Sequence, residues 1–307
     1  MRSPGPSIAA ETRSLAKIID SVQPDLVHLH SSKAGLAGRL ALRGRRPTVF
    51  QPHGWSFEAV QGALAWTAMR WERIGAHWAH SILCVSEAER DRGLSHGIRA
   101  TFRVVPNGVD LTTFCEAGDS EHGAARRRLG LGDQPLVVCV GRLCKQKGQD
   151  VLVAAWPRVR ARVPDAELAL VGSGDSEAAL RQAGGAGVSL VGPREDIPDW
   201  LAAADVVALP SRWEGMSLVL LEAMARGRSI VATDVNGVRE AMGHAGAVVP
   251  IEDRDALSAA IAERLLDPAR RAREGAEAAE RARRRHDLRD TLRRTVELYQ
   301  ELLATSA

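Results

Sequence analysis

Two cations among glycines mark the first place in this sequence that could do chemistry. In the segment 141–148, Arg142 and Lys147 follow an apolar run, together with Gly141 and Gly148. Glycine lets a backbone approach a ligand closely, and the start of the next helix offers free N–H groups that favour an anion. The segment therefore predicts a phosphate site, with a solvent-facing turn that carries incidental charges as the alternative. The Walker pattern G-x-x-x-x-G-K-[ST] is absent, so a nucleotide would be bound in another way.

Two acids eight residues apart mark the second place. Glu214 lies in a predicted loop after an apolar run, and Glu222 lies about one turn into a predicted helix. The chain between them begins with Gly215 and would present backbone N–H groups to a ligand, those of Met216, Ser217 and Leu218. Carboxylates accept hydrogen bonds well from sugar hydroxyls. N–H groups between two acids therefore suit a sugar nucleotide, whereas the alternative for Glu222 is an ordinary acid on a helix surface.

Histidines make up the third group. His53 ends an apolar run, where it is either a polar group at a ligand site or a structural histidine. His28 and His30 flank one residue of a predicted strand and so share a face. His30 precedes the segment 31–35, which contains Lys33 and predicts a second polar loop. Metal binding by the histidine pair is not predicted, because no acid stands near it in the sequence.

Other patterns are weaker. The segment 172–174 reads Gly-Ser-Gly after an apolar run, but Glu177 occupies the place of the third glycine in a dinucleotide fingerprint, so NAD binding is not predicted. The segment 86–89 has the pattern of a helix capping box, and we assign it no further role. The sequence lacks the G-x-S-x-G elbow of an α/β-hydrolase.

The elements that must position these residues alternate between short apolar runs and segments with helical spacing. The predicted strands form two series: 26–30, 48–51, 81–85 and 103–105, then 136–140, 167–171, 188–191, 206–209, 229–232 and 247–249. Helical segments include 149–162, 176–182, 218–225 and 254–266. This alternation predicts an α/β protein with two doubly wound parallel sheets, that is, two Rossmann-like domains.

The polar stretch 110–133 interrupts the apolar rhythm and predicts the break between the domains. We expect an N-terminal domain over 1–113, a C-terminal domain over 114–286 and a terminal amphipathic helix over 287–307. The segment 270–285 predicts a solvated helix with many ion pairs rather than a basic binding patch. The first strand series has about four members where such a domain usually has six or seven, so the N-terminal domain is predicted to be incomplete.

The composition excludes several classes of protein. The chain has 307 residues, 45% of them hydrophobic, which is enough for two cores. Its net charge of +3 comes from interspersed positive and negative residues, so a nucleic-acid partner is not indicated. The four cysteines lack zinc or redox spacing, and no run approaches the roughly 18 apolar residues of a membrane span. A cytoplasmic protein is therefore predicted. Contact with the inner face of a membrane is a further hypothesis that rests on Arg39, Arg43, Arg45 and Arg46, with a solvated surface as the alternative.

Taken together and in their order, these motifs resemble the retaining glycosyltransferases of family 4, which have the GT-B fold. The resemblance runs through nearly the whole chain and rests on His53-Gly54, the 106–110 segment Pro-Asn-Gly-Val-Asp, Gly141-Arg142 with Lys147-Gly148, and the pair Glu214 and Glu222. Each motif is modest alone, but the set is specific. The segment 30–35 further resembles members that act in exopolysaccharide or lipid-linked glycan assembly.

The resemblance implies two Rossmann-like domains that face a cleft. The C-terminal domain would bind a UDP- or GDP-sugar, and the other domain would bind a glycan, lipid-linked or small-molecule acceptor. Arg142 and Lys147 would neutralise the departing diphosphate without a metal or cofactor. Glu222 would hold the ribose, Glu214 and the amides of 216–218 would position the sugar, and His53 would lie near it. The resemblance also places the base on the loop around Arg194, and His30 and Lys33 on the acceptor side. Family members are thought to retain configuration by attack from the face of the departing phosphate, so no protein nucleophile is expected.

One departure bears on activity. Family members open with a strand and a glycine-rich loop, and Met1 here is expected to fall about sixty residues into the usual first domain. We therefore keep a second hypothesis, a nucleotide-sugar-binding protein with little or no transferase activity. A third is a sugar-nucleotide epimerase of the same fold, which would interconvert sugars without an acceptor.

Overall fold

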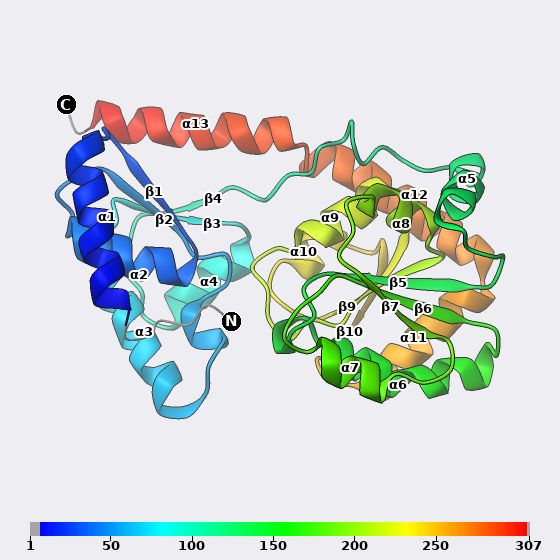
Figure 1. Cartoon of the computed structure of the whole chain (residues 1–307). Helices are drawn as coiled ribbons and strands as arrows, with labels where there is room; N and C mark the ends of the chain where they lie inside the picture. Colours follow the sequence, from blue (N-terminus) through cyan, green and yellow to red (C-terminus); the bar gives the residue numbers. More distant parts are fainter. Residues whose placement is uncertain (1–6, 306–307) are drawn as a thin grey trace. The chain divides into compact units, whose positions relative to one another are not determined.

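The computed structural model describes residues 7–305, which divide into two units by their internal contacts (Figure 1). Unit 1 contains the chain up to Asn107, the short segment Glu214–Met216 and the chain from Asp290 onward. Unit 2 contains Gly108–Trp213 and Ser217–Arg289. The domain limits at 113/114 and 286/287 stay predictions.

Unit 1 is built on a parallel sheet of four strands in the order β1-β2-β3-β4. The strands are β1 (Val27–His30), β2 (Thr48–Gln51), β3 (Ser81–Cys84) and β4 (Phe102–Val104). All residues of β2 and β3 are buried, as expected of apolar runs covered on both faces. The four predicted strands are thus confirmed, within one residue at each end.

The helices of unit 1 are α1 (Ile8–Val22), α2 (Ser31–Leu42), α3 (Gly62–Ala76), α4 (Glu87–Ser95) and α13 (Leu288–Ala304), with a short 3₁₀ turn η1 (Ser56–Glu58). Helix α2 packs on β1 and β2, and α4 packs on β3 and β4. The main core cluster gathers around the fully buried Phe50, Trp55 and Ile82. Leu298 of α13 joins a second cluster with Val49 and Leu83, so α13 covers one part of the same sheet.

The prediction of a polar loop at 31–35 is wrong, because helix α2 begins directly at Ser31. The chain turns from β1 into α2 at one residue, Ser31, whose φ is +70°. Gly35 and Gly38 serve packing: a Cβ atom on Gly35 would lie 2.2 Å from the Phe50 ring, and one on Gly38 would lie 2.3 Å from Leu29. A loop was expected because sequence alone does not show these contacts.

Unit 2 contains a six-stranded parallel sheet in the order β10-β9-β8-β5-β6-β7. Its strands are β5 (Leu136–Val140), β6 (Glu167–Val171), β7 (Val188–Gly192), β8 (Val206–Leu209), β9 (Ser229–Thr233) and β10 (Gly246–Val249). All six were predicted. The chain enters the sheet at β5, which pairs with β6 on one side and β8 on the other. This reversal of strand order is the point where open α/β sheets usually bind ligands.

Helices cover both faces of this second sheet (Figure 1). One layer holds α6 (Gln149–Arg162), α7 (Glu177–Ala183) and α11 (Arg254–Leu266). The other holds α8 (Ile197–Ala203), α9 (Leu218–Ala225) and α12 (Pro268–Arg285). The remaining helices of the unit are α5 (Asp119–Leu129) and α10 (Val238–Met242), and a 3₁₀ turn η2 spans Lys145–Lys147. The doubly wound α/β architecture predicted for this part of the chain is confirmed.

Arg39 does not belong to a basic surface, contrary to its place in the membrane hypothesis. Its side chain is fully buried and forms an ion pair with Glu72, with 2.7 Å between Nη2 and Oε2. The guanidinium also lies over the Phe50 ring, 3.8 Å from the ring centroid. A buried charge requires such a partner, and Glu72 on α3 supplies it. Arg39 therefore ties α2 to α3 within the core of unit 1.

Within residues 7–305, no helix combines the length and the apolar character that a membrane crossing needs.

Candidate active site

The loop after β5 brings the first predicted cluster together in unit 2. Gly141 ends the strand, and the aliphatic part of Lys147 folds back against it, so that a Cβ atom on Gly141 would lie 3.6 Å from Lys147 Cδ. Lys147 therefore lies beside the backbone that leads into Arg142. The Arg142 guanidinium donates to Gln146 Oε1 at 3.1 Å. Both predicted cations thus belong to one folded loop.

Two glutamine side chains hold this loop. Gln149, which is buried, donates through Nε2 to the Arg142 carbonyl at 2.9 Å. Gln146 donates through Nε2 to the Trp213 carbonyl at 3.0 Å, and its own carbonyl accepts from Arg212 N–H at 2.8 Å. The loops after β5 and β8 are therefore hydrogen-bonded to each other, as the pairing of these two strands requires.

Gly148 completes the junction between the two loops. Its φ is +66°, and a Cβ atom there would lie 2.0 Å from the carbonyl oxygen of Pro210. Only glycine fits both the left-handed backbone and this contact. Helix α6 starts immediately after it, at Gln149.

The second predicted cluster leads into helix α9. Ser217 occupies the N-cap position without a side-chain capping bond, and α9 begins at Leu218. The first N–H groups of a helix have no partner within the helix, so they are available to an anion at this end. Glu222 lies on the next turn, as predicted. Burial raises the pKa of Glu222, while the positive charge of Lys147 acts to lower it, which places the two side chains within electrostatic reach.

The segment 172–174 packs against the loop after β5 (residues 141–148), in which a phosphate site is predicted. A Cβ atom on Gly172 would lie 2.1 Å from the Gly141 carbonyl oxygen, and one on Gly174 would lie 2.4 Å from that of Leu143. The two glycines therefore allow the loops after β5 and β6 to touch, which explains them without a dinucleotide.

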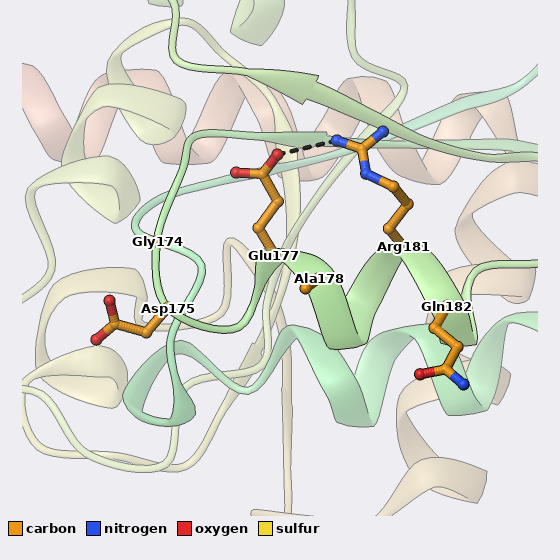
Figure 2. A pocket seen from close by; sticks show the side chains of 6 residues that line it. All are labelled: Gly174, Asp175, Glu177, Ala178, Arg181 and Gln182. Atoms are coloured by element: carbon orange, nitrogen blue, oxygen red, sulfur yellow. Dashed lines mark hydrogen bonds and ion pairs between the residues drawn. The ribbon is translucent and has the colours of Figure 1, made fainter.

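A hollow of about 620 Å³ lies beyond Gly174, at the start of α7. Figure 2 shows that Glu177 and Arg181 pair across its rim, with 2.9 Å between Oε1 and Nη2. None of the residues predicted to bind a ligand lines this hollow. The ligand site predicted from the sequence lies elsewhere, at the loops that follow β5 and β8, and it stays a prediction.

Arg194 follows β7, where the resemblance placed a nucleotide base. Its guanidinium is held by Asp196, with 2.8 Å between Nε and Oδ1. This ion pair lowers the pKa of Asp196 and fixes the side chain within its own loop. A role for Arg194 in binding a donor stays a prediction.

In unit 1, a tight turn after β2 carries His53. Both His53 (φ +55°) and Gly54 (φ +99°) adopt left-handed backbone conformations. The turn lies against the segment Glu214–Met216: a Cβ atom on Gly215 would lie 2.9 Å from Gly54 N and from the His53 carbonyl carbon. Asn107 of the 106–110 motif anchors that segment by donating to the Met216 carbonyl at 2.9 Å. The predicted residues His53 and Glu214 are thereby brought together, and Glu214 is buried.

Three histidine rings form a stack at the end of β1 and β2. The ring centroids of His28 and His30 are 3.9 Å apart, and a hydrogen bond of 3.0 Å joins His30 Nδ1 to His53 Nε2. On the other side, the hydroxyl of Tyr299 lies 2.5 Å from His28 Nδ1. Burial, with the charges of the other two rings, lowers the pKa of His28 to about 3. Partial burial and His30 lower the pKa of His53 to about 4. The stack is therefore neutral near pH 7.

Lys33 lies in the first turn of α2 and pairs with Glu11 of α1, with 2.8 Å between Nζ and Oε1. Its charge is thus directed to a neighbouring helix. The acceptor-side role that the resemblance implies for Lys33 stays a prediction, as does that of His30.

Sequence reasoning missed three kinds of contributor. Gln146 and Gln149 form hydrogen bonds that hold the loop after β5, but their positions in the sequence do not predict these bonds. Tyr299 lies within the predicted terminal amphipathic helix, and its contact with His28 spans 271 positions. Glu89 was assigned to a capping box, and its carboxylate lies beneath the His53 turn. Long-range contacts of this kind leave no local pattern.

Chemically, the two units offer different groups. Unit 2 presents two cations, a helix start and a half-buried acid, which suit a diphosphate attached to a sugar. Unit 1 presents a histidine stack, whose rings can donate and accept hydrogen bonds, and Glu214, whose side-chain oxygens can accept hydrogen bonds from hydroxyl groups.

Comparisons with known proteins bear directly on this chemistry. The family described as "Glycosyltransferase Family 4" matches residues 2–113, and the family described as "Glycosyl transferases group 1" matches residues 134–267. A GDP-mannose-dependent alpha-(1-6)-phosphatidylinositol monomannoside mannosyltransferase from Mycobacterium tuberculosis is 33% identical over 86% of this chain and 72% of its own length. The chain belongs to glycosyltransferase family 4.

A relative with the same description from Mycolicibacterium smegmatis shares 40% identity with this family 4 chain over 258 residues, 78% of the chain. The chain spans 66% of that relative's length. The sucrose-phosphate synthase of Thermosynechococcus elongatus superposes on 97% of the chain and 79% of its own, with a TM-score of 0.85 and 26% identity. The expected GT-B fold, with two parallel sheets of four and six strands, is therefore confirmed.

Proposed function

We propose that this family 4 chain transfers a sugar from a nucleotide diphosphate sugar to an acceptor, with retention of the anomeric configuration. The observation that supports the proposal is the pair of hydrogen-bonded loops after β5 and β8 in unit 2. Arg142 and Lys147 belong to the first loop, and Lys147 acts electrostatically on Glu222 of α9, the helix that follows the second loop.

In the proposed reaction, Arg142 and Lys147 bind the diphosphate and stabilise the charge that develops as the glycosidic bond breaks. Glu222 accepts hydrogen bonds from the ribose hydroxyls, and the N–H groups at the start of α9 bind a phosphate oxygen. His53 and Glu214 bind hydroxyl groups of the transferred sugar. No group of the chain is assigned as a nucleophile, in keeping with attack from the face of the departing phosphate.

Donor binding tests this assignment. Calorimetry with GDP-mannose is the first measurement, because the relatives described above are named for that donor, and a UDP-sugar is the second. Arg142→Ala removes a charge-assisted contact worth roughly 1.5–3 kcal/mol, so the Kd should rise at least about tenfold. Glu222→Ala should act in the same direction.

Lys145→Ala is the matched control, since Lys145 is an exposed cation of the same loop with no assigned ligand. Its Kd should stay within about twofold of wild type. If Arg142→Ala and Glu222→Ala both bind and turn over donor like wild type, the site assignment is wrong. Donor affinity without transfer to any acceptor would instead support a binding protein without transferase activity.

The acceptor we propose is a lipid-linked glycan, reached at the surface of a membrane. Helix α3 of unit 1 supports this partner. Its exposed residues include Leu64, Trp66 and Ile74, which are 68%, 56% and 53% exposed. The guanidinium of Arg70 lies over the Trp66 ring, 4.7 Å from its centroid. Within α3, which the structure describes completely, the one acid is Glu72, and it is buried. An apolar, basic helix surface with tryptophan suits the interface of an anionic membrane.

A further inference from the structure

The carboxylate of Glu89 is buried directly beneath the turn that carries His53. The residue is 0% exposed, in the first turns of α4. One carboxylate oxygen accepts from Gly54 N–H, and the other accepts from Val85 N–H at 2.8 Å. Glu89 therefore joins the end of β3 to the residue that follows His53.

The turn itself needs such support. His53 bears a side chain at a φ of +55°, and left-handed backbone costs a residue other than glycine about 1–2 kcal/mol. Such a conformation persists when surrounding contacts determine it. The hydrogen bond from Gly54 N–H to Glu89 is a contact of this kind.

Helix α4 supplies two further contacts to the same turn. The indole N–H of Trp55 donates to the Glu89 carbonyl at 2.7 Å, and Trp55 is 1% exposed. Gly93, one turn farther along α4, leaves room for that indole: a Cβ atom on it would lie 2.6 Å from the Trp55 ring. Helix α4 thus contacts residues 54 and 55 through the side chain and the backbone carbonyl of Glu89, and Gly93 leaves room for the indole of residue 55.

From this geometry we propose that Glu89 is a positioning residue for His53 in sugar transfer, an inference that rests on the proposed function. Glu89 touches neither reactant. It fixes the backbone of the turn, and the turn fixes the direction in which the His53 ring projects toward His30. Loss of its acceptor would leave two backbone N–H groups, those of Val85 and Gly54, short of a partner, so the turn would relax.

Burial raises the pKa of Glu89 to about 7, against the two N–H groups, which lower it. Glu58 adds to the rise. An amide has the shape of the protonated acid, so Glu89→Gln keeps the volume and replaces one acceptor by a donor that faces an N–H group. This substitution tests the hydrogen bonds with little change in packing.

The experiment compares Glu89→Gln with wild type in kcat, donor KM, donor Kd and the ring NMR signals of His53, assigned with His53→Gln. We expect kcat to fall about tenfold or more, the equivalent of one lost hydrogen bond of about 1.4 kcal/mol. The donor Kd should stay within about twofold, since the diphosphate-binding residues belong to unit 2. The His53 signals should shift.

Glu274→Gln is the control, because Glu274 is a buried carboxylate of unit 2 that is paired with Arg264. It should lower the melting temperature without moving the His53 signals. Unchanged kcat and unchanged His53 signals in Glu89→Gln would overturn the inference. If Glu89→Gln does not fold, Trp55→Phe, which removes the indole donor together with part of the ring, should shift the same signals; unmoved signals would overturn the inference. A wild-type chain that binds no nucleotide sugar would overturn the proposed function, while the NMR comparison would still test the position of His53.

Discussion

At the scale of single residues, burial changes the pKa of several ionisable groups of the predicted site. Burial raises the pKa of Glu222, and the positive charge of Lys147 offsets part of that rise. The histidine rings stay neutral chiefly because burial lowers their pKa, and the neighbouring histidines lower the pKa of His28 and His53 further. Neutral rings can both donate and accept hydrogen bonds, which suits sugar hydroxyls.

The stack predicts a dependence of stability on pH. In the folded chain the pKa of His28 is about 3, whereas the ordinary value is about 6.5. The unfolded chain therefore binds more protons between these values, so the contribution of His28 is complete above pH 6.5 and is lost as the pH falls toward 3. Urea unfolding between pH 7 and pH 4 should show a steeper decline in wild type than in His28→Gln.

Exposed His244 provides the control for that measurement, and His244→Gln should decline like wild type. Glu89, whose pKa is raised, changes the stability in the opposite direction, but it does so equally in wild type and in both variants. The difference between His28→Gln and wild type therefore gives the contribution of His28. Parallel curves for wild type and His28→Gln would contradict the prediction.

At the scale of elements, the ligand loops depend on glycines that bring backbones into contact. Gly148 lies where the loops after β5 and β8 touch. A Cβ atom added to it would lie 2.0 Å from the carbonyl oxygen of Pro210. No other residue type fits without moving one of the loops.

Gly148→Ala should therefore lower both stability and donor affinity. Gly130→Ala is a matched control, because Gly130 has nearly the same φ, +67° against +66°, with nothing within 4 Å of an added Cβ. The control should lose about 1 kcal/mol from backbone strain alone. Gly148→Ala should lose more, by about 1–3 kcal/mol, and raise the donor Kd several-fold. Equal losses in urea unfolding and equal Kd values would contradict this role for the Pro210 contact.

Elements could be predicted from the sequence to the extent that their signals are local. All ten strands are short apolar runs that end in Gly, Pro, Ser or His or in polar residues, and each lies where it was expected. Helix α2 was missed because β1 runs into it through Ser31 alone, without the polar loop that usually separates such elements. The candidate site was predicted from motif spacing. Glu89 and Tyr299, in contrast, contact partners 35 and 271 positions away, and no sequence period encodes such contacts.

At the scale of the whole molecule, the proposed lipid-linked acceptor requires that the chain reach the surface of a membrane. Arg39 is withdrawn from that contact by its buried pair with Glu72, whereas Arg43 and Arg45 are exposed and stay candidates. Helix α3 is another candidate for membrane contact, because it exposes apolar side chains together with Arg70 and Arg73.

We therefore predict that the chain sediments with anionic phosphatidylglycerol vesicles and less with phosphatidylcholine vesicles. Trp66→Ala should weaken binding to anionic vesicles at least about threefold, since an interfacial tryptophan contributes on the order of 1 kcal/mol. Leu266→Ala, which removes another exposed apolar side chain, 57% exposed in unit 2, should bind like wild type. Equal binding by all three proteins would contradict a role for α3.

The framework of the phosphate loop is held by two neutral amides, Gln146 and Gln149. Uncharged hydrogen bonds are nearly insensitive to ionic strength, whereas the attraction between two cations and a diphosphate is screened by salt. At high ionic strength the affinity for a diphosphate should therefore fall while the conformation of the loop is kept, because different interactions determine the two.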